Sequence, residues 1–446
     1  MERIAQHPQD VHEHPLGKEA TVDGSTVSFD LDDPTLLFRQ DFLDEPATLY
    51  AYLRAHAPVW ELPGTGTFLV TSAALISEAV ARPEDFSSNL LGLMYTGYDG
   101  LPAVFDMAHL GPAIHVLATS DPPLHTRHRR LMQPLFSPGA VEAISGFLDA
   151  TADELIGSLV ATGRGDFATA VAEPLPVQVI CSMIGIPEAD VAMLTPLVLQ
   201  SNDLLAGVVD AATMGASAEA SMKVVGYLDP LVRGWRANDE GTTVCDALAR
   251  ACAAGEITVE DGLGMLVQLL GAGTETTTSL IGRVALQLAR DAELQQTLRE
   301  NLDLVPALLE ETLRFDGPFR FHYRAAVRDA ELGGTHIPAG SRVLLMWGAA
   351  NLDEDFFERP DEFDIARSGL RSHFAFGRGI HFCIGAPLAR MEARRTVERL
   401  LRSTTEFSLD PDGIPAYRRT IFVRRLESLP FVLTAAATAG RSQTSQ

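Results

Sequence analysis

The chain has 446 residues, of which 46% are hydrophobic, and a formal net charge of −24. Its length allows one large domain or two ordinary ones, and its composition allows a large core. The acidic balance argues against nucleic acids and anionic membrane surfaces as partners. We find no apolar run of about eighteen residues and no leader peptide, and four scattered cysteines do not form a disulfide framework. We therefore expect a soluble, cytoplasmic protein.

The first part of the chain alternates between weak and strong structural signals. Residues 1–27 carry three histidines and no apolar period, which predicts a poorly ordered arm, with metal binding as the alternative. Residues 46–55 and 73–81 are predicted to be helices. Between them, 59–62 and 67–70 flank the turn sequence PGTG and are predicted to form a β-hairpin.

Residues 87–119 lack a steady period and contain four glycines. A loop this long in a compact domain is usually functional. Its apolar side chains can form the wall of a ligand pocket, and the alternative is ordinary packing of a loop against the core. The candidates for such a wall are Leu93, Met94, Tyr95, Phe105 and Met107.

The segment 121–130 begins with DPPLH and is predicted to open a helix. His125 and Arg129 are four residues apart, so they share one helix face. Two such groups can hold a pair of carboxylates, although the same spacing is common on exposed helices.

Residues 138–253 are predicted to be mostly helical, and a long helix is predicted at 258–290. TVED at its start resembles a capping box. Inside this helix, residues 271–278 read GAGTETTT, although each mid-helix glycine costs about 1 kcal/mol relative to alanine. Small residues allow a flat ligand to lie against the helix. Glu275 would have a raised pKa if buried, which suits proton transfer; the alternative is a tight helix crossing with Glu275 on the surface.

Further along, Glu311 and Arg314 stand three residues apart and can form a bidentate pair on one helix face. Residues 319–324 alternate enough for a strand, and Phe319 and Phe321 are candidates to face a substrate. Strands are also predicted within 331–350, and a hairpin is predicted between 420–423 and 429–434.

The most informative stretch is 376–385, which reads FGRGIHFCIG. Its glycines predict a tight turn whose backbone approaches another group closely. Cys383 directly precedes a strong helix-forming run, and a helix N-terminus favours a thiolate over a thiol. A single thiolate with close glycines and an aromatic neighbour suits a flat iron macrocycle better than a tetrahedral ion. The alternative for one cysteine is a small buried hydrophobe.

This stretch resembles the haem-binding loop of the cytochrome P450 superfamily, with matches at Phe376, Gly377, Gly379, His381, Cys383 and Gly385. Four further segments resemble family motifs in the family's order. They are the propionate-contacting helix at 121–130, the oxygen-activation groove around 271–276, the Glu-x-x-Arg signature at Glu311 and Arg314, and the distal arginine at Arg367. The resemblance spans roughly residues 40–435 and is strongest to soluble actinobacterial members.

The resemblance implies a predominantly α fold with a smaller β lobe, and haem b (iron protoporphyrin IX) between the long central helix and the cysteine-loop helix. Cys383 would be the iron ligand, Glu275 and Thr276 would deliver protons, and Glu311, Arg314 and Arg367 would be structural. The remaining cofactor-binding positions would be His125, Arg129, Ala272, Gly273, Arg324, Phe376, Gly377, His381 and Gly385.

The resemblance further implies a monooxygenase that inserts one atom of O2 into a lipophilic small molecule by hydroxylation or epoxidation. We expect one catalytic domain at 28–436, a polar tail at 437–446, and a monomer with neither nucleic-acid nor membrane partners. No flavin or nicotinamide module is evident, so electrons would come from a ferredoxin and its reductase, docked on basic residues that include Arg129 and Arg378. The alternatives are a peroxide-driven enzyme, an isomerase, and a haem sensor or carrier.

Overall fold

The structure is a computed structural model that describes residues 20–22, 25–110, 114–234 and 241–437. Most of the predicted N-terminal arm and nearly all of the predicted C-terminal tail lie outside these ranges. Of the arm, the structure describes one short antiparallel pair, β1 and β2.

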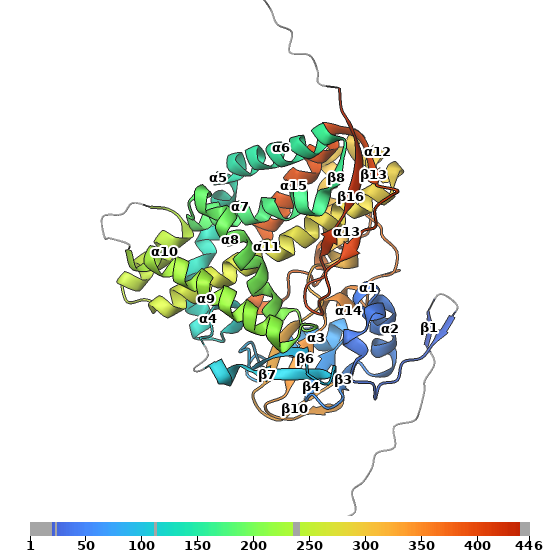
Figure 1. Ribbon diagram of the computed structural model, residues 1–446. Coiled ribbons are helices and arrows are strands. Elements are labelled where there is room, and N and C mark those ends of the chain that lie inside the picture. The colour runs from blue at the N-terminus through green and yellow to red at the C-terminus, as the bar shows by residue number, and fades with distance from the viewer. Residues whose placement is uncertain (1–19, 23–24, 111–113, 235–240, 438–446) are drawn as a thin grey trace, which may run out of the picture.

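Helices form most of the molecule and pack around one central helix, α11, which runs through its middle (Figure 1). The α-helices are α1 Gln40–Asp44, α2 Ala47–His56, α3 Ala73–Val80, α4 Leu124–Met132, α5 Pro138–Ala143, α6 Ser145–Thr162, α7 Pro174–Ile184, α8 Glu188–Ser201, α9 Ala211–Gly234, α10 Val244–Ala253, α11 Val259–Arg290, α12 Ala292–Glu300, α13 Val305–Asp316, α14 Trp347–Asn351 and α15 Ala386–Ser403.

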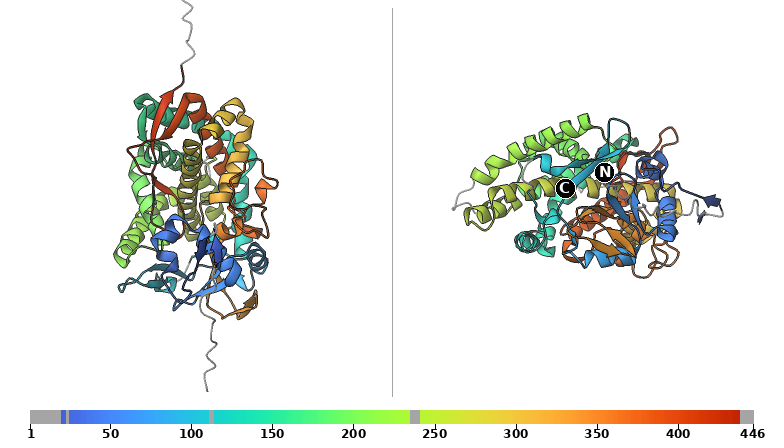
Figure 2. Two further views of the ribbon diagram at one scale, coloured as in Figure 1. Left: turned by 90° about the vertical axis from the view of Figure 1, so that its right-hand side faces the viewer. Right: turned by 90° about the horizontal axis from the view of Figure 1, so that it is seen from below.

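The strands make several small sheets. They are β1 Ala20–Val22, β2 Ser25–Val27, β3 Val59–Leu62, β4 Thr67–Val70, β5 Phe86–Ser87, β6 Gly92–Thr96, β7 Pro102–Asp106, β8 Arg164–Asp166, β9 His322–Ala326, β10 Ala330–Leu332, β11 Thr335–Ile337, β12 Arg342–Leu345, β13 Thr404–Leu409, β14 Ala416–Tyr417, β15 Leu426–Ser428 and β16 Pro430–Ala435. The largest sheet has the order β3-β4-β12-β9-β5, and another has the order β13-β16-β8. These two sheets lie at opposite ends of the molecule (Figure 2).

The central helix α11 starts where its sequence predicts. The Thr258 hydroxyl accepts the N–H of Asp261 at 3.0 Å, and the Asp261 carboxylate accepts the N–H of Thr258 at 3.1 Å. This reciprocal capping box satisfies two backbone donors that the first helical turn leaves free. The helix then continues without a break through residues 271–278, because buried packing on both sides outweighs the poor helix propensity of glycine and threonine.

Two predictions about strands are wrong. Within the expected loop 87–119, β6 and β7 pair as an antiparallel hairpin. Residues 420–423 do not pair with 429–434; instead β16 pairs with β13 and β8, and Val423 forms a single bridge with Phe319. Local alternation identifies a strand but not its partner, since pairing depends on which distant segment lies alongside.

Among the described residues, no single helix has the length and hydropathy to span a membrane. The bent pair Ala168–Ile184 and Glu188–Leu205 meets that criterion only when its two parts are taken together.

Candidate active site

The cysteine loop is shaped by glycines in left-handed conformations. Gly377 and Gly379 have φ angles of 68° and 69°, which residues with a Cβ rarely adopt. A Cβ on Gly379 would also lie 2.6 Å from Val80 Cγ1. The N–H of Cys383 donates to the carbonyl of Phe376 at 2.9 Å and closes the loop. The sulfur is thereby presented just before the first turn of α15.

Cys383 remains partly accessible because cavities reach it, yet the surrounding protein raises the pKa of its thiol. Desolvation is the largest cause, and it outweighs the N–H of Gly385 and the charges of Arg129 and Arg390. The helix N-terminus alone therefore does not produce the expected thiolate. A bound metal ion would lower the pKa of the thiol far enough to form the thiolate, because a thiol that coordinates a metal is deprotonated outright.

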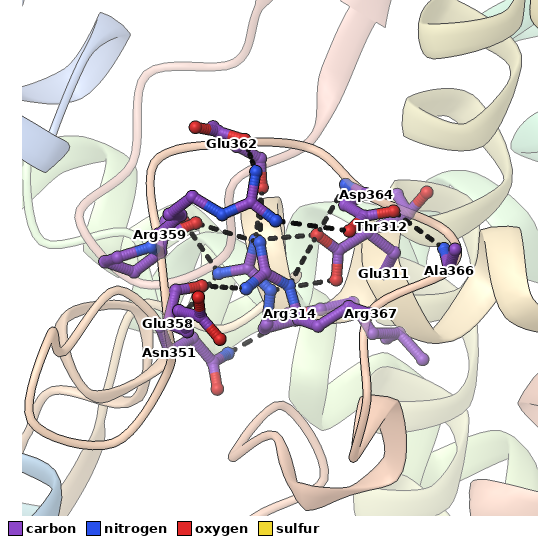
Figure 3. A network of polar contacts seen from close by, with 12 residues as sticks. Glu311, Thr312, Arg314, Asn351, Glu358, Arg359, Glu362, Asp364, Ala366 and Arg367 are labelled. Atoms are coloured by element: carbon purple, nitrogen blue, oxygen red, sulfur yellow. Dashed lines mark hydrogen bonds and ion pairs between the residues drawn. The ribbon is translucent and has the colours of Figure 1, made fainter.

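A buried network holds the segment that leads into the cysteine loop (Figure 3). Arg314 and Glu311 are fully buried and form two hydrogen bonds, at 2.9 and 2.7 Å. Arg367 approaches the same carboxylate at 3.3 Å. The other N–H groups of Arg314 donate to the carbonyls of Asn351, Pro360 and Glu362. Helix α13 is thus tied to the segment 351–367.

A second carboxylate on α13 anchors the loop itself. Glu310 accepts two hydrogen bonds from Arg390, at 2.6 and 2.9 Å, and lies 3.0 Å from His373 Nε2. Burial by itself raises the pKa of Glu310, but Arg390 and His373 outweigh it and lower the pKa to about 2. The Arg390 guanidinium also lies 4.4 Å from the ring centroid of Phe376, so it steadies that ring.

Most of the predicted site residues meet at one cavity of about 200 Å³ between the cysteine loop and α11. A second cavity, of about 910 Å³, reaches Cys383 from the side of α4. The predicted residues that line the first are His125, Arg129, Ala272, Gly273, Thr276, Phe319, Arg324, Phe376, Gly377, His381, Cys383 and Gly385. Its walls also include Leu117 and Ala118, from the end of the segment 87–119 that was predicted to wall a pocket. Residues that the sequence did not single out line it too, among them Ile180, Gln268, Leu269, Leu280, His322 and Trp347.

One wall of this cavity carries cationic and hydrogen-bonding groups without acidic partners. The rings of His125 and His381 lie 4.2 Å apart, and the Nε2 atom of each is buried without a hydrogen-bond partner. Burial lowers the pKa of His381 to about 3 and that of Arg324 to about 10. Arg324 donates to a backbone carbonyl at 2.7 Å, and so does Arg129 at 2.6 Å. Such a set fits a ligand that brings its own carboxylates.

The predicted substrate-facing residues are mostly misplaced. Phe321 packs in the core against Tyr323 and Phe422, and His322 lines the cavity in its place. The Nδ1 atom of His322 accepts the indole N–H of Trp347 at 2.6 Å. The signal was available, because side chains alternate along a strand and residue 322 shares the face of Arg324.

The five candidates from the expected loop also lie outside the cavity, and Met107 packs against the core of the β lobe. Leu93 and Met94 are buried in the core of the β lobe, while Leu93 and Tyr95 pair along the hairpin with Phe105 and Ala103. These contacts correspond to the alternative of ordinary packing.

The opposite wall is the small-residue stretch of α11. Ala272, Gly273 and Thr276 line the cavity, and the Thr276 hydroxyl donates to the carbonyl of Ala272 at 2.7 Å. A Cβ on Gly273 would lie 3.1 Å from Ile180 Cγ1 on α7. The glycine therefore serves a tight helix crossing as well as the cavity, so the alternative interpretation holds for Gly273.

Glu275 is mostly buried beside this wall, with 14% of its side chain exposed, and does not line the cavity. Its nearest charged partner is Arg425, with Oε1 and Nε 3.5 Å apart. Burial raises the pKa of Glu275 to about 7, against the opposing charges of Arg425 and Arg418. Arg425 also donates to Glu173 at 3.0 Å. The surface position considered as an alternative is wrong for Glu275.

The donor set of the cavity suits haem. No group of three or more histidine, cysteine or acidic side chains that could hold a metal ion is found in the part of the chain that the structure describes. Cys383 would therefore be the one protein ligand of an iron whose other ligands come from a macrocycle. The unpartnered Nε2 atoms of His125 and His381 are suited to bind the propionates of that macrocycle. The fold and the site define a haem-thiolate protein.

Comparison with known proteins identifies the family. A family model described as Cytochrome P450 matches residues 215–420. The chain is 36% identical to Cytochrome P450 144 of Mycobacterium tuberculosis, over 89% of this chain and 91% of the relative. It is 32% identical to the vitamin D(3) 25-hydroxylase of Pseudonocardia autotrophica, over 89% and 96%. Its fold matches the CYP109E1 structure from Bacillus megaterium in complex with testosterone with a TM-score of 0.77, at 27% identity, over 88% and 99% of the two chains.

The chain belongs to the cytochrome P450 family. It is a monooxygenase of that family and binds haem b, with the predominantly helical fold that the sequence predicts. When bound, haem supplies the iron that activates dioxygen and accepts single electrons.

Proposed function

We propose that this monooxygenase inserts one oxygen atom from O2 into a lipophilic small molecule, by hydroxylation or epoxidation, with electrons from a separate protein. One observation carries the proposal. Thr276 faces the cavity from α11, while Cys383 faces it from the opposite side. A haem bound in this cavity would take its thiolate ligand from Cys383, and the Thr276 hydroxyl would be available for proton transfer in the same cavity.

Glu275 and Thr276 have different roles in proton transfer. Glu275 holds a proton near neutral pH, since burial raises its pKa to about 7, and Arg425 can pair with it when the proton leaves. The Thr276 hydroxyl is the group of this pair that touches the cavity, and it passes the proton to the reacting oxygen. His125, Arg129, Arg324 and His381 hold the propionates, and Cys383 ligates the iron.

The substrate is a bulky apolar compound, such as a steroid, terpenoid or polyketide. The cavity wall that faces it includes Leu117, Ile180, Leu269 and Phe319, and apolar walls with few polar groups select such ligands. The names of two similar proteins, a vitamin D(3) hydroxylase and a testosterone complex, support the same class.

The electron donor is a ferredoxin, served by its reductase, and it docks on the groove that reaches Cys383 beside α4. Ile380 and Phe382 are 44% and 42% exposed there, with Arg130 alongside. An apolar centre with basic neighbours suits an acidic partner. Arg378, which the sequence suggested for this role, is engaged internally with Ser372. The nearby Arg390 is engaged with Glu310. We expect Arg130→Glu to raise the KM for ferredoxin about tenfold, and Arg402→Glu, away from the groove, to leave it unchanged.

A spectral titration of the holoenzyme with apolar compounds tests the proposal. Ligands that displace the water from haem iron change its spin state, and accepted compounds are then incubated with ferredoxin, reductase and O2. Substrate-dependent formation of a product that carries one atom of O2 supports the proposal. Product formed only with peroxide, or no product from any compound that shifts the spectrum, would favour the peroxide-driven enzyme or the carrier.

A further inference from the structure

A third cavity, of about 710 Å³, lies on the other side of Phe319 from the haem cavity. Its lining residues come from helix α2, the C-terminal parts of α11 and α13, and the segment around α14. Phe319 lines both cavities. None of the residues assigned to haem, protons or electron transfer lines this third space, which we call the arginine cavity.

Three buried arginines form its inner wall. Arg283, Arg320 and Arg424 are at most 7% exposed. Asp316 is their shared acidic neighbour: Arg424 Nε donates to it at 3.0 Å, and Arg283 also pairs with it. Arg320 donates to the backbone carbonyls of Phe42 and Leu43, at 3.2 and 2.5 Å, and lies beside the Tyr50 hydroxyl. Three positive charges therefore meet one negative charge at this wall.

Several donors at the same wall have no partner. Arg283 Nε and Nη1, Arg320 Nε and the Tyr50 hydroxyl are buried without a hydrogen bond. Burial lowers the pKa of Arg283 to about 9 and that of Arg320 to about 10, although the neighbouring Tyr417 and Tyr50 oppose the shift. Unpaired buried donors are costly, so native proteins rarely keep them without a ligand or water.

The remaining acidic residues of the cavity do not neutralise the positive charges of this wall. Glu354 is paired with Arg54 at 2.9 Å, while Glu45 and Asp361 are exposed at the rim. Arg290 is also exposed and adds a further positive charge at the entrance. The net charge of the whole chain is −24, so a positive cavity is contrary to the rest of the molecule.

We infer that the arginine cavity binds a small organic anion with two negative charges on oxygen, such as a phosphate monoester or a dicarboxylate. Guanidinium groups bind such oxygens in bidentate geometry, and two charges match the excess at the inner wall. The ligand would accept from Arg283 and Arg320, while Arg290 attracts it at the rim. The volume exceeds what a bare phosphate ion fills and leaves room for an organic group.

The test is the melting temperature of the holoenzyme with inorganic phosphate or succinate, compared with chloride at equal ionic strength. A ligand that binds only the folded state raises the melting temperature, here by on the order of 2–5 °C at saturation. Arg283→Met removes one of the three positive charges of the inner wall and should abolish the rise, while leaving the anion-free melting temperature near that of the wild type, because Arg424 still pairs with Asp316. Whichever of phosphate and succinate gives the larger rise in melting temperature shows whether the ligand is a phosphate or a dicarboxylate.

A rim variant keeps the inference testable if Arg283→Met does not fold. Arg290→Gln changes only an exposed side chain and should weaken anion affinity severalfold. The matched control is Arg402→Gln, an exposed arginine on α15 that does not line the cavity, and it should bind like the wild type. Equal melting temperatures in phosphate, succinate and chloride would overturn the inference, as would a rise that persists unchanged in Arg283→Met and Arg290→Gln.

Discussion

The two sides of the haem cavity differ in how completely their polar groups are bonded. Behind the cysteine loop, Arg314 makes hydrogen bonds to the two oxygens of Glu311 and to three backbone carbonyls, and Glu310 is held by Arg390 and His373. Beside α11, Glu275 has one charged contact at 3.5 Å, and the buried Thr278 hydroxyl has no partner.

This difference indicates that the residues behind the cysteine loop have a structural role and that those beside α11 have a chemical role. A fully satisfied buried network fixes one geometry, and that is what an iron ligand requires. A buried carboxyl with few partners has a shifted pKa and can exchange a proton, and that is what the opposite side requires. We therefore expect substitutions behind the loop to remove the folded holoenzyme, and substitutions beside α11 to change its chemistry.

The largest expected effect comes from disrupting the hydrogen-bond network behind the cysteine loop. Arg314→Ala removes both hydrogen bonds of the closer arginine and leaves the buried Glu311 carboxylate with Arg367 as its one charged partner, at a cost of about 3–5 kcal/mol. That is a large part of the stability of a typical protein. We expect little or no soluble haem-loaded protein, measured as haem absorbance per mole of chain. In the control, Arg359→Ala removes an exposed pair with Glu362 and should change stability by less than about 1 kcal/mol.

On the side of the cavity beside α11, the variant Glu275→Gln should have the largest effect. The proton-donating form of Glu275 is lost as the pH rises through its pKa of about 7, so the wild-type rate of product formation should fall above that pH. Removing the acid should lower kcat about 100-fold and flatten the pH profile, while haem content is retained. Glu173→Gln, which changes the other carboxylate on Arg425, should keep the descending limb. An unchanged profile in Glu275→Gln would remove this residue from proton delivery.

Thr276→Ala should separate electron consumption from product formation. Without the hydroxyl at the cavity, we expect about tenfold less product per electron pair, with the missing electrons recovered as hydrogen peroxide. Thr274→Ala is the matched control, because Thr274 makes the same kind of backbone hydrogen bond, to Gly271, but does not line the cavity. Equal coupling in both variants would contradict the role of Thr276.

The smallest effect should follow from Gly273→Ala. The added methyl group would lie 3.1 Å from Ile180 and would also enter the cavity wall. We expect severalfold weaker binding of apolar ligands in the spin-state titration, with haem content unchanged. At Gly282 a new Cβ would keep 3.6 Å from Leu426, so Gly282→Ala should leave ligand binding unchanged and gain up to about 1 kcal/mol of helix stability.

Local spacing predicted the parts of the site that depend on one helix turn or one loop. The pair Glu311 and Arg314, the shared face of His125 and Arg129, and the cap at Thr258 follow from separations of three or four residues. The predominantly helical architecture was predicted from the family resemblance, and the central helix was predicted from the capping sequence at its start.

The distant contacts could not be predicted in the same way. Ile180 reaches the cavity from a segment with no chemical signal of its own, and the partner of Glu275 is Arg425, 150 positions away. The partners of β16 and the packing of Leu93 likewise depend on which segments the fold brings together. Sequence periodicity determines which face of an element is buried, but not which distant residue covers it.

The central claim is that the sulfur of Cys383 ligates haem iron. The most direct measurement is the absorption difference between the reduced holoenzyme with and without carbon monoxide. The wild type and Cys252→Ser, which changes another partly exposed cysteine, should both show the long-wavelength Soret band of thiolate-ligated haem, and Cys383→Ser should lose it. The absence of that band in the wild type, or its persistence in Cys383→Ser, would contradict the account.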